Sequence, residues 1–424
     1  TQLESRDGKL DWVIARPGMS GFFTLNPDRS WSNFVDYTAF PSEFFHPDAQ
    51  LADLVGDGLT DLALIGPRSV RLYSSRRAVG FSHGANVPRG DNDDSLPLLS
   101  SSQTELVAFS DPLGSATQHL IRIRHNEVKC WPNLGHGKFG KGFVLCELKF
   151  PYAEFDSSRV RLADLDGSGA VDLIYLESDG FRVYMNHAGE GFEENYVKVP
   201  WPKDVRYDRF CQVSIADLNG LGCSSLILTV PHMKPEHWRY DFVSAKPYLV
   251  NASHNNMGAV TGVSYRSSAQ EWLDEKAELI AAGKAPVSHL PFAMHLVSQQ
   301  TQLDEITGNR LTQGFTYRQG FYDSFEREFR GFGLLLQTDT EASATERSSP
   351  GFTAPILSKT WFHTGRAIDM RDDDYYAGDA EAKPLKETLL HEYHLSDAAG
   401  RVIDPDEDLA PLLHGSSPVR RGVP

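Results

Sequence analysis

A loop rich in aspartate and glycine recurs along the first half of the chain. Its clearest copies begin at Asp53, Asp164 and Asp217, and each leads into a short apolar segment. A weaker copy begins at Asp111, so that successive copies lie 58, 53 and 53 residues apart. A period of this length indicates a solenoid, a propeller or an array, in which each repeat forms one supersecondary unit.

Each loop is followed by two segments with the pattern of β-strands, joined by a tight turn. In the Asp164 copy, an apolar run ends at Leu176, a turn follows at residues 178–180, and an alternating segment covers residues 181–186. Similar alternating segments occur at residues 21–26, 69–73 and 127–131. Short strands, tight turns and this period predict a β-propeller in which each repeat is one four-stranded blade. The 3.6-residue amphipathic pattern of helical solenoids does not occur in the repeats.

The Asp/Gly loops resemble the FG-GAP repeats that form propellers in integrin heads and in many bacterial surface and toxin proteins. Two further stretches, residues 255–270 and 327–333, resemble a narrower family, the B component of bacterial Tc toxin complexes. This second resemblance extends from Thr1 to about Trp361. It implies an all-β chain: a propeller of about six blades in the full protein, with four to five repeats visible here, followed by long antiparallel strands of a β-shell.

The resemblance also implies a function. In this family the propeller docks a toxin-enclosing cocoon of B and C components onto the pentameric A-component channel and gates release of the toxin. The implied protein is therefore a non-enzymatic assembly and translocation component that folds in the bacterial cytoplasm and is then released. Its implied partners are an A component and a C component that carries the toxin. The alternative from another class is an FG-GAP adhesion module that binds a host receptor or glycan.

The repeat ends near residue 231, which predicts a domain boundary there. Residues 1–231 are expected to be propeller repeats with a truncated first blade, residues 232–366 shell strands, and residues 367–424 shell or linker. One helix is predicted at residues 268–282, because Ser268 and Glu271 have capping-box spacing and Gly283 follows. The other apolar patterns predict strands at residues 294–304, 311–317, 332–338 and 357–363.

Charge and composition exclude several classes of partner. Lys and Arg number 41 and Asp and Glu 57, and the resulting net charge of −16 repels nucleic acid. No apolar run approaches the roughly 20 residues of a membrane-spanning helix. The four cysteines show no metal-site spacing, which favours folding with reduced thiols. Since the chain begins at Thr1 without Met, we expect a fragment of a longer polypeptide.

The Asp164 loop is the strongest candidate for a metal site. Oxygen donors stand at alternate positions of a tight loop and can converge on Ca²⁺: Asp164, Asp166, Ser168, Ala170 through its carbonyl, and Asp172. An EF-hand is excluded because Tyr175 stands where its bidentate glutamate would be. The alternative is a structural turn whose carboxylates accept hydrogen bonds from backbone N–H groups. The remaining loops are degenerate copies that contain Asp53, Asp57, Asp61, Asp111, Asp217 and Asn219.

No catalytic residues are predicted. Residues 163–168 resemble the opening of a phosphatase with an aspartate nucleophile, but such an enzyme needs alternating strands and helices, which the sequence lacks. The motif at His391 to His394 has its histidines three residues apart, whereas the zinc motif HExxH has them four apart. The sequence contains no P-loop and no G-x-S-x-G motif. No cofactor is therefore required, and calcium is the one candidate ion.

Overall fold

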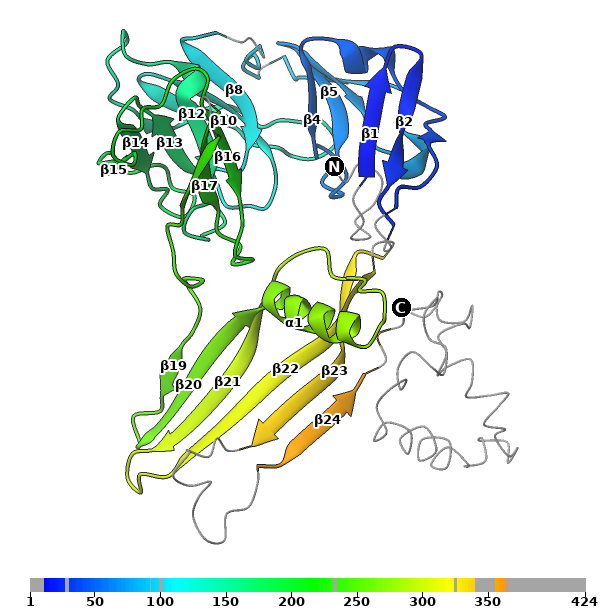
Figure 1. Ribbon diagram of the computed structural model, residues 1–424. Coiled ribbons are helices and arrows are strands. Elements are labelled where there is room, and N and C mark those ends of the chain that lie inside the picture. Colours follow the sequence, from blue (N-terminus) through cyan, green and yellow to red (C-terminus); the bar gives the residue numbers. More distant parts are fainter. Residues whose placement is uncertain are drawn as a thin grey trace. The chain divides into compact units, whose positions relative to one another are not determined.

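The computed structural model describes residues 11–26, 30–91, 93–98, 102–231, 235–323, 326–339, 355–362 and 364. The chain divides into two compact units, Thr1–Val250 and Asn251–Pro424, which are described separately below. Among the described residues, α1 (Ser268–Ala281) is the one α-helix, and almost all other regular structure is β-strand (Figure 1). The all-β fold class predicted from the sequence is confirmed. No helix in this described part of the chain is long and apolar enough to cross a membrane.

The first unit contains five antiparallel sheets that follow one another along the chain. In each sheet the strands are paired in chain order, which is the meander topology of propeller blades. The first sheet comprises β1 (Asp11–Arg16), β2 (Met19–Thr24) and β3 (Val35–Asp36), and the second β4 (Ala49–Ala52), β5 (Asp61–Ile65), β6 (Ser69–Tyr73) and β7 (Ala85–Pro88). The third comprises β8 (Glu105–Ser110), β9 (His119–Arg124), β10 (Glu127–Trp131) and β11 (Phe143–Glu147). The last two comprise β12 (Val160–Ala163), β13 (Asp172–Leu176), β14 (Gly180–Tyr184) and β15 (Val197–Pro200), then β16 (Gln212–Ala216), β17 (Ser225–Val230) and β18 (Glu236–Tyr240).

The hydrophobic core of this unit lies between successive sheets. Successive side chains of a strand point to opposite faces, so the second strand of a four-stranded blade can pack against both neighbouring sheets. In β9, Leu120 packs in one cluster with Ala63 of β5, whereas Ile121 packs in another with Leu173 of β13. Each fully buried aliphatic side chain of this kind contributes about 1.5–3 kcal/mol. The repeated sheets therefore stabilise one another as a series.

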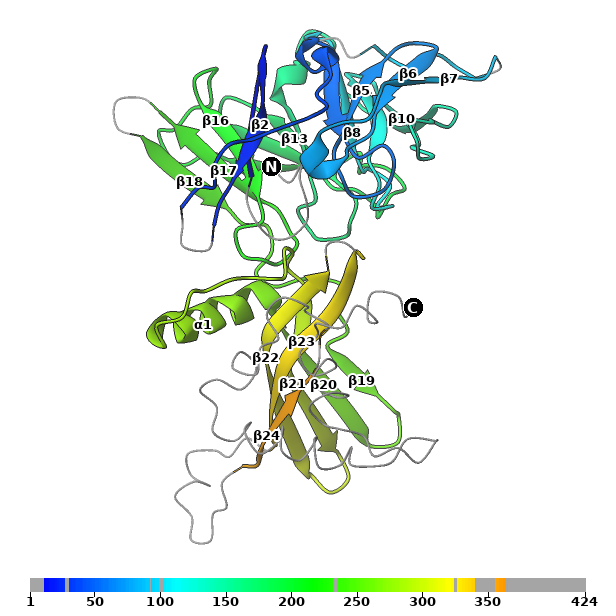
Figure 2. The same ribbon diagram turned by 90° about the vertical axis from the view of Figure 1, so that its right-hand side faces the viewer.

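The second unit is a single six-stranded antiparallel sheet, again paired in chain order. Its strands are β19 (Ala252–His254), β20 (Ala259–Ser267), β21 (His295–Asp304), β22 (Arg310–Asp323), β23 (Glu328–Asp339) and β24 (Leu357–Trp361). The hairpin expected between residues 294 and 317 is β21–β22. Strand β22 continues to Asp323, beyond the expected end, because it stays paired with β23 over that length. Figure 2 shows α1 on one side of this sheet.

Helix α1 begins as predicted but is capped by a different residue. Ser267, whose backbone is extended, accepts a hydrogen bond from the Ala269 N–H and is the N-cap. The Ser268 hydroxyl instead accepts the Met294 N–H. Glu271 does not close a capping box, because its carboxylate is turned toward the sheet and buried. Gly283, with φ of +71°, follows the last turn as expected.

The buried face of α1 is charged. Glu271 is paired with Arg318 of β22 at 2.8 Å and with Arg266 of β20 at 2.8 Å. It also accepts the Tyr317 N–H, and Glu278 forms a second pair with Arg318. These hydrogen-bonded ion pairs hold the helix on the sheet. Removing one partner leaves the other charge buried without its counter-ion, which is destabilising.

We expect Glu271→Ala to lower the free energy of unfolding of the second unit by about 3 kcal/mol, because Arg318 loses its buried partner. Asp274→Ala is the matched control. Asp274 also pairs with Arg266 but is much more exposed, and its loss is expected to cost less than about 1 kcal/mol. Urea unfolding followed by circular dichroism measures both variants, and equal losses would contradict this account of the helix.

Candidate functional site

The last aspartate of the Asp164 loop joins two parts of its repeat. Asp172 is the first residue of β13 and is fully buried. One carboxylate oxygen accepts the Leu165 N–H at 2.8 Å, and the other accepts the N–H of Asn186, fourteen residues further along the chain, also at 2.8 Å. Asp61 makes the equivalent bonds in the second sheet, to Leu54 and Val55 on one oxygen and to Ser75 on the other.

The first aspartate closes the loop itself. Asp164 accepts the N–H groups of Gly167 at 2.6 Å and Gly169 at 2.9 Å. Asp53 makes the same pair of bonds to Gly56 and Gly58, both at 2.7 Å. All four glycines have φ between +74° and +91°, a conformation that favours glycine. These are the hydrogen bonds that the turn interpretation of the loops expects.

The oxygen atoms proposed as calcium ligands are also close together. Carboxylate oxygens of Asp164, Asp166 and Asp172 lie within 4.8 Å of one another. The Tyr248 hydroxyl donates to Asp166 at 2.6 Å, and the Ser168 hydroxyl lies 3.4 Å from the Ala170 carbonyl. Every residue of the predicted ligand set therefore already has a hydrogen-bond partner within the chain.

A fixed cation lies beside this loop. The Lys246 ammonium donates to the Gly167 carbonyl at 2.7 Å and acts against the rise in the pKa of Asp164 that burial causes. Burial raises the pKa of Asp172 to about 6. Burial also opposes ionisation of Asp166, but hydrogen bonds from Tyr248 and Ser168 outweigh it and lower the pKa of that carboxyl. The Lys246 ammonium thus supplies a positive charge beside the carboxylates of the loop. Calcium binding at this loop stays a prediction.

One of the degenerate copies keeps the bond to the backbone N–H fourteen residues further along, with a histidine in place of the aspartate. His119 is the first residue of β9, and its Nδ1 accepts the N–H of Asn133, again fourteen residues on, at 2.9 Å. Its Nε2 lies 2.8 Å from the Ser115 hydroxyl and 3.6 Å from Asp111. In the last sheet, the Ser225 hydroxyl donates to Asp241. A neutral imidazole therefore takes the acceptor role of the buried carboxylate in the third sheet, whereas the Ser225 hydroxyl of the last sheet makes a different bond, to a side chain.

Sequence analysis missed the asparagines that connect one sheet to the loop of the preceding sheet. The Asn186 amide donates to the Pro112 carbonyl and to the Val171 carbonyl, both at 2.9 Å. Asn133 reaches the Asp53 carbonyl in the same way at 3.5 Å. A signal was present, because each asparagine precedes a phenylalanine by six residues, at Phe139 and Phe192.

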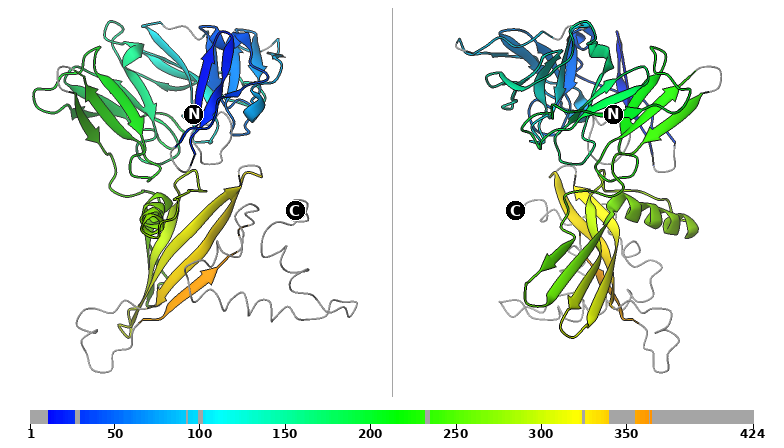
Figure 3. Two further views of the ribbon diagram at one scale, coloured as in Figure 1. Left: turned by 45° about the vertical axis from the view of Figure 1, so that its right-hand side comes forward. Right: turned by 90° about the vertical axis from the view of Figure 1, so that its left-hand side faces the viewer.

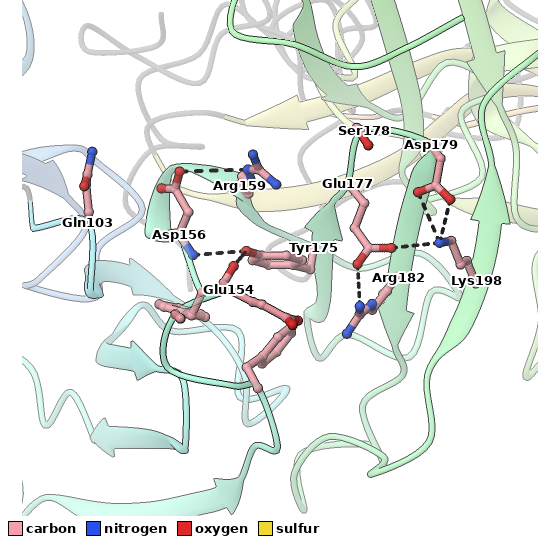
Figure 4. Close-up of a pocket in the computed structure, with 13 residues that line it drawn as sticks. Gln103, Glu154, Asp156, Arg159, Tyr175, Glu177, Ser178, Asp179, Arg182 and Lys198 are labelled. Atoms are coloured by element: carbon pink, nitrogen blue, oxygen red, sulfur yellow. Dashed lines mark hydrogen bonds and ion pairs between the residues drawn. The ribbon is translucent and has the colours of Figure 1, made fainter. Parts of the chain in front are cut away.

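An open pocket of about 540 Å³ lies near the β13–β14 turn (Figure 4). Its charged side chains pair with one another: Glu177 with Arg182 and Lys198, and Lys198 with Asp179 at 2.9 Å. The Tyr175 hydroxyl accepts the Asp156 N–H and donates to the Glu154 carbonyl. Because these groups neutralise one another, the pocket offers no evident nucleophile or general base, and none of its residues was a sequence candidate.

Comparisons with known proteins give one family. Residues 186–365 match the family described as insecticide toxin TcdB middle/N-terminal region. The Photorhabdus luminescens Tc holotoxin pore is 44% identical over 92% of this chain and 17% of that chain, with a TM-score of 0.79. The TcdB2-TccC3 structure is 46% identical over 85% of this chain and 17% of that chain, with a TM-score of 0.64. TcdB2-TccC3 without its hypervariable C-terminal region is 40% identical over 97% and 19%, with a TM-score of 0.65.

The chain spans less than a fifth of the length of these solved chains. No curated protein matches it.

If the loops act as turns, Asp172→Ala is expected to lower the free energy of unfolding by about 2–4 kcal/mol, because two backbone N–H groups lose a buried acceptor. Asp166→Ala is expected to cost less, since Asp166 is only partly buried. Urea unfolding in EGTA and in millimolar Ca²⁺ measures both. The turn interpretation is contradicted if Ca²⁺ raises the urea midpoint of the wild type and Asp166→Ala abolishes that rise.

The third sheet is expected to weaken on acidification. Burial lowers the pKa of His119 below its unfolded value of about 6.5, so the stability that the neutral ring contributes is present above that pH and is lost as pH falls below it through the lowered folded pKa. Protonation also turns Nδ1 from an acceptor into a donor that faces the Asn133 N–H. Asp111 is the carboxylate facing the ring, and it moderates the effect without preventing it.

His119→Asn supplies an amide oxygen that does not titrate, so its stability should change less than that of the wild type between about pH 7.5 and about pH 5. His187→Asn, at a largely exposed histidine, is the control and should keep the wild-type profile. Urea midpoints across this range measure the difference. Identical profiles for wild type and His119→Asn would show that His119 does not determine the response.

Proposed function

Because the chain belongs to the family of Tc toxin B components, whose middle region it matches, we propose that it docks a toxin-containing B–C complex onto an A component and gates release of the toxin. The observation that carries this proposal is the series of five meander sheets, in a chain that is 44% identical over 92% of its length to part of a Tc holotoxin pore. The proposal concerns the full-length protein. This chain corresponds to less than a fifth of the matched chain in the holotoxin pore structure.

The arrangement of loops supports docking through one end of the sheets. Each of the four Asp/Gly loops connects the first strand of its sheet to the second, so these loops lie at one end of the sheets. Hairpin turns such as that between β13 and β14 lie at the other end. Two of these loops, those of Asp53 and Asp111, are tied to the following sheet by Asn133 and Asn186. The turns are free of these ties, and we propose that the turn end meets the A component.

The proposed role is non-catalytic and requires no cofactor. The paired charges of the Glu177 pocket support this, since they leave no evident reactive group there. The partners proposed are an A component and a toxin-carrying C component, and the protein is proposed to act after its release from the bacterium. A freestanding adhesion propeller is less well supported, because the chain continues into the six-stranded sheet β19–β24.

Charge reversal at the two ends tests the docking surface. Asp179→Lys changes the β13–β14 turn, and Glu190→Lys makes the same charge change at the opposite end of the same sheet. Since the chain is acidic, its partner should present basic groups, and Asp179→Lys in the full-length B–C complex should weaken binding to the A component severalfold at low salt. Glu190→Lys should leave binding near the wild-type value.

Binding is measured by surface plasmon resonance over a range of salt concentrations. A larger effect of Glu190→Lys would place docking at the Asp/Gly loops and contradict the proposed orientation. If the unmodified B–C complex does not bind the A component, the proposed function itself is wrong.

A further inference from the structure

The segment that follows the fifth sheet contacts the Asp164 loop of the fourth sheet. We name residues 242–250, which come after β18 and end the first unit, the exit strap. The fifth sheet, from which the strap leaves, is drawn in green in Figure 3. The strap begins in the hydrophobic core, where the ring centroid of Phe242 lies 6.2 Å from that of Phe181 in β14. Its first residue is therefore held by packing.

Two polar side chains hold the rest of the strap on the loop. The Lys246 ammonium donates to the Gly167 carbonyl at 2.7 Å. The Tyr248 hydroxyl donates to the Asp166 carboxylate at 2.6 Å. Beyond its first residue, the strap is thus closed by hydrogen bonds to the backbone and to a side chain of one loop.

The strap takes the place of an asparagine contact found in the other sheets. In the third and fourth sheets, an asparagine stands two residues after the aromatic residue that pairs with the first leucine of the second strand: Asn133 after Trp131, and Asn186 after Tyr184. In the fifth sheet Tyr240 has this pairing, so Phe242 stands where the asparagine would be. Phenylalanine has no donor to offer to the preceding loop. The loop carbonyl receives the Lys246 ammonium instead.

A comparison of two glycines shows that this loop is fitted to the strap. Gly167 and Gly56 each stand three residues after the first aspartate of their loops, with φ of +75° and +88°. A Cβ added at Gly167 would overlap the Lys246 ammonium and would lie 2.7 Å from the Cys223 Sγ. A Cβ added at Gly56 would meet nothing within 4 Å. The close approach of the lysine therefore distinguishes the Asp164 loop from the Asp53 loop.

The backbone of the strap is strained where it meets the loop. Tyr248 has a φ of +62°, a left-handed conformation that is unfavourable for a residue with a Cβ and persists where other contacts determine it. The Tyr248 side chain is 73% exposed, so burial of its ring contributes little. The hydrogen bond to Asp166 is the contact that compensates for the strain. A strained segment held by few bonds opens more readily than the sheets beside it.

We propose that the exit strap is a conformational device, which Lys246 and Tyr248 hold closed on the Asp164 loop and which opens while the sheets stay folded. In the closed state, residues 249–251 are the free connection between Tyr248 and β19. In the open state, the free connection begins after Phe242 and comprises residues 243–251. The strap therefore sets how much free chain separates the fifth sheet from the first strand of the second unit.

Limited proteolysis of the full-length protein tests the proposal, because chymotrypsin cleaves beside Tyr248 and Leu249 only when the segment is released. The double variant Lys246→Met with Tyr248→Phe removes both donors and keeps an aromatic cleavage site. Cleavage at 248–250, identified by mass spectrometry, should be at least about tenfold faster than in the wild type, since it tracks the population of the open form. Lys203→Met with Tyr196→Phe, at exposed residues of the same unit, is the control and should keep the wild-type rate. An unchanged rate in the first double variant would overturn the proposal.

A second measurement separates opening of the strap from unfolding of the sheets. The double variant at Lys246 and Tyr248 should keep the wild-type urea midpoint, and its early cleavage should be confined to the strap. Early cleavage within β12–β18 at the same rate would show general unfolding and would also overturn the proposal.

Two comparisons test the contacts themselves. Once Asp166→Ala has been made, adding Tyr248→Phe should leave the cleavage rate unchanged, because the two residues act through one bond; rates that multiply would contradict this. Gly167→Ala should accelerate cleavage of the strap and Gly56→Ala should not, although both place a Cβ at a positive φ. Equal effects would overturn the assigned role of Lys246. None of these measurements involves the A component, so their outcome is separate from that of the docking experiment.

Discussion

A buried carboxylate at the start of the second strand is the interaction on which the first unit depends. In burying Asp172 the chain places a charge where solvation is poor, and the backbone N–H groups of Leu165 and Asn186 compensate for that loss. Because one carboxylate holds both the loop and the segment after the third strand, each through a different oxygen, the leucine that follows the aspartate is directed into the contact with the preceding sheet. Local hydrogen bonding and the packing between sheets are thus set by one side chain.

The replacements of this carboxylate give the sheets different responses to acid. Since burial raises the pKa of Asp172 to about 6, above its unfolded value, its contribution to stability is greatest at low pH and falls as pH rises through that value. His119 has the opposite dependence, because burial favours its neutral form. The third and fourth sheets have the same geometry, but the contributions of His119 and Asp172 to stability therefore change in opposite directions with pH. This difference could not be inferred from the fold alone.

The period and the strand pattern were sufficient to predict much of the fold. The alternating segments at residues 69–73 and 127–131 are β6 and β10, and the helix was placed to within one residue at its C-terminal end. The errors have physical causes. Glu271 has capping spacing, but its long-range pair with Arg318 is stronger than a local bond and is invisible to local patterns.

The asparagine contacts make the series of sheets directional. Asn133 and Asn186 each donate a hydrogen bond to the loop of the preceding sheet. These bonds therefore run in one direction along the series, from a sheet to the one before it. In such an array, energies between nearest neighbours dominate, and cooperativity decays along the chain of contacts. Mechanical force applied to one end would then detach sheets in order, each rupture releasing the next loop, and the two directions of pulling would meet different resistance.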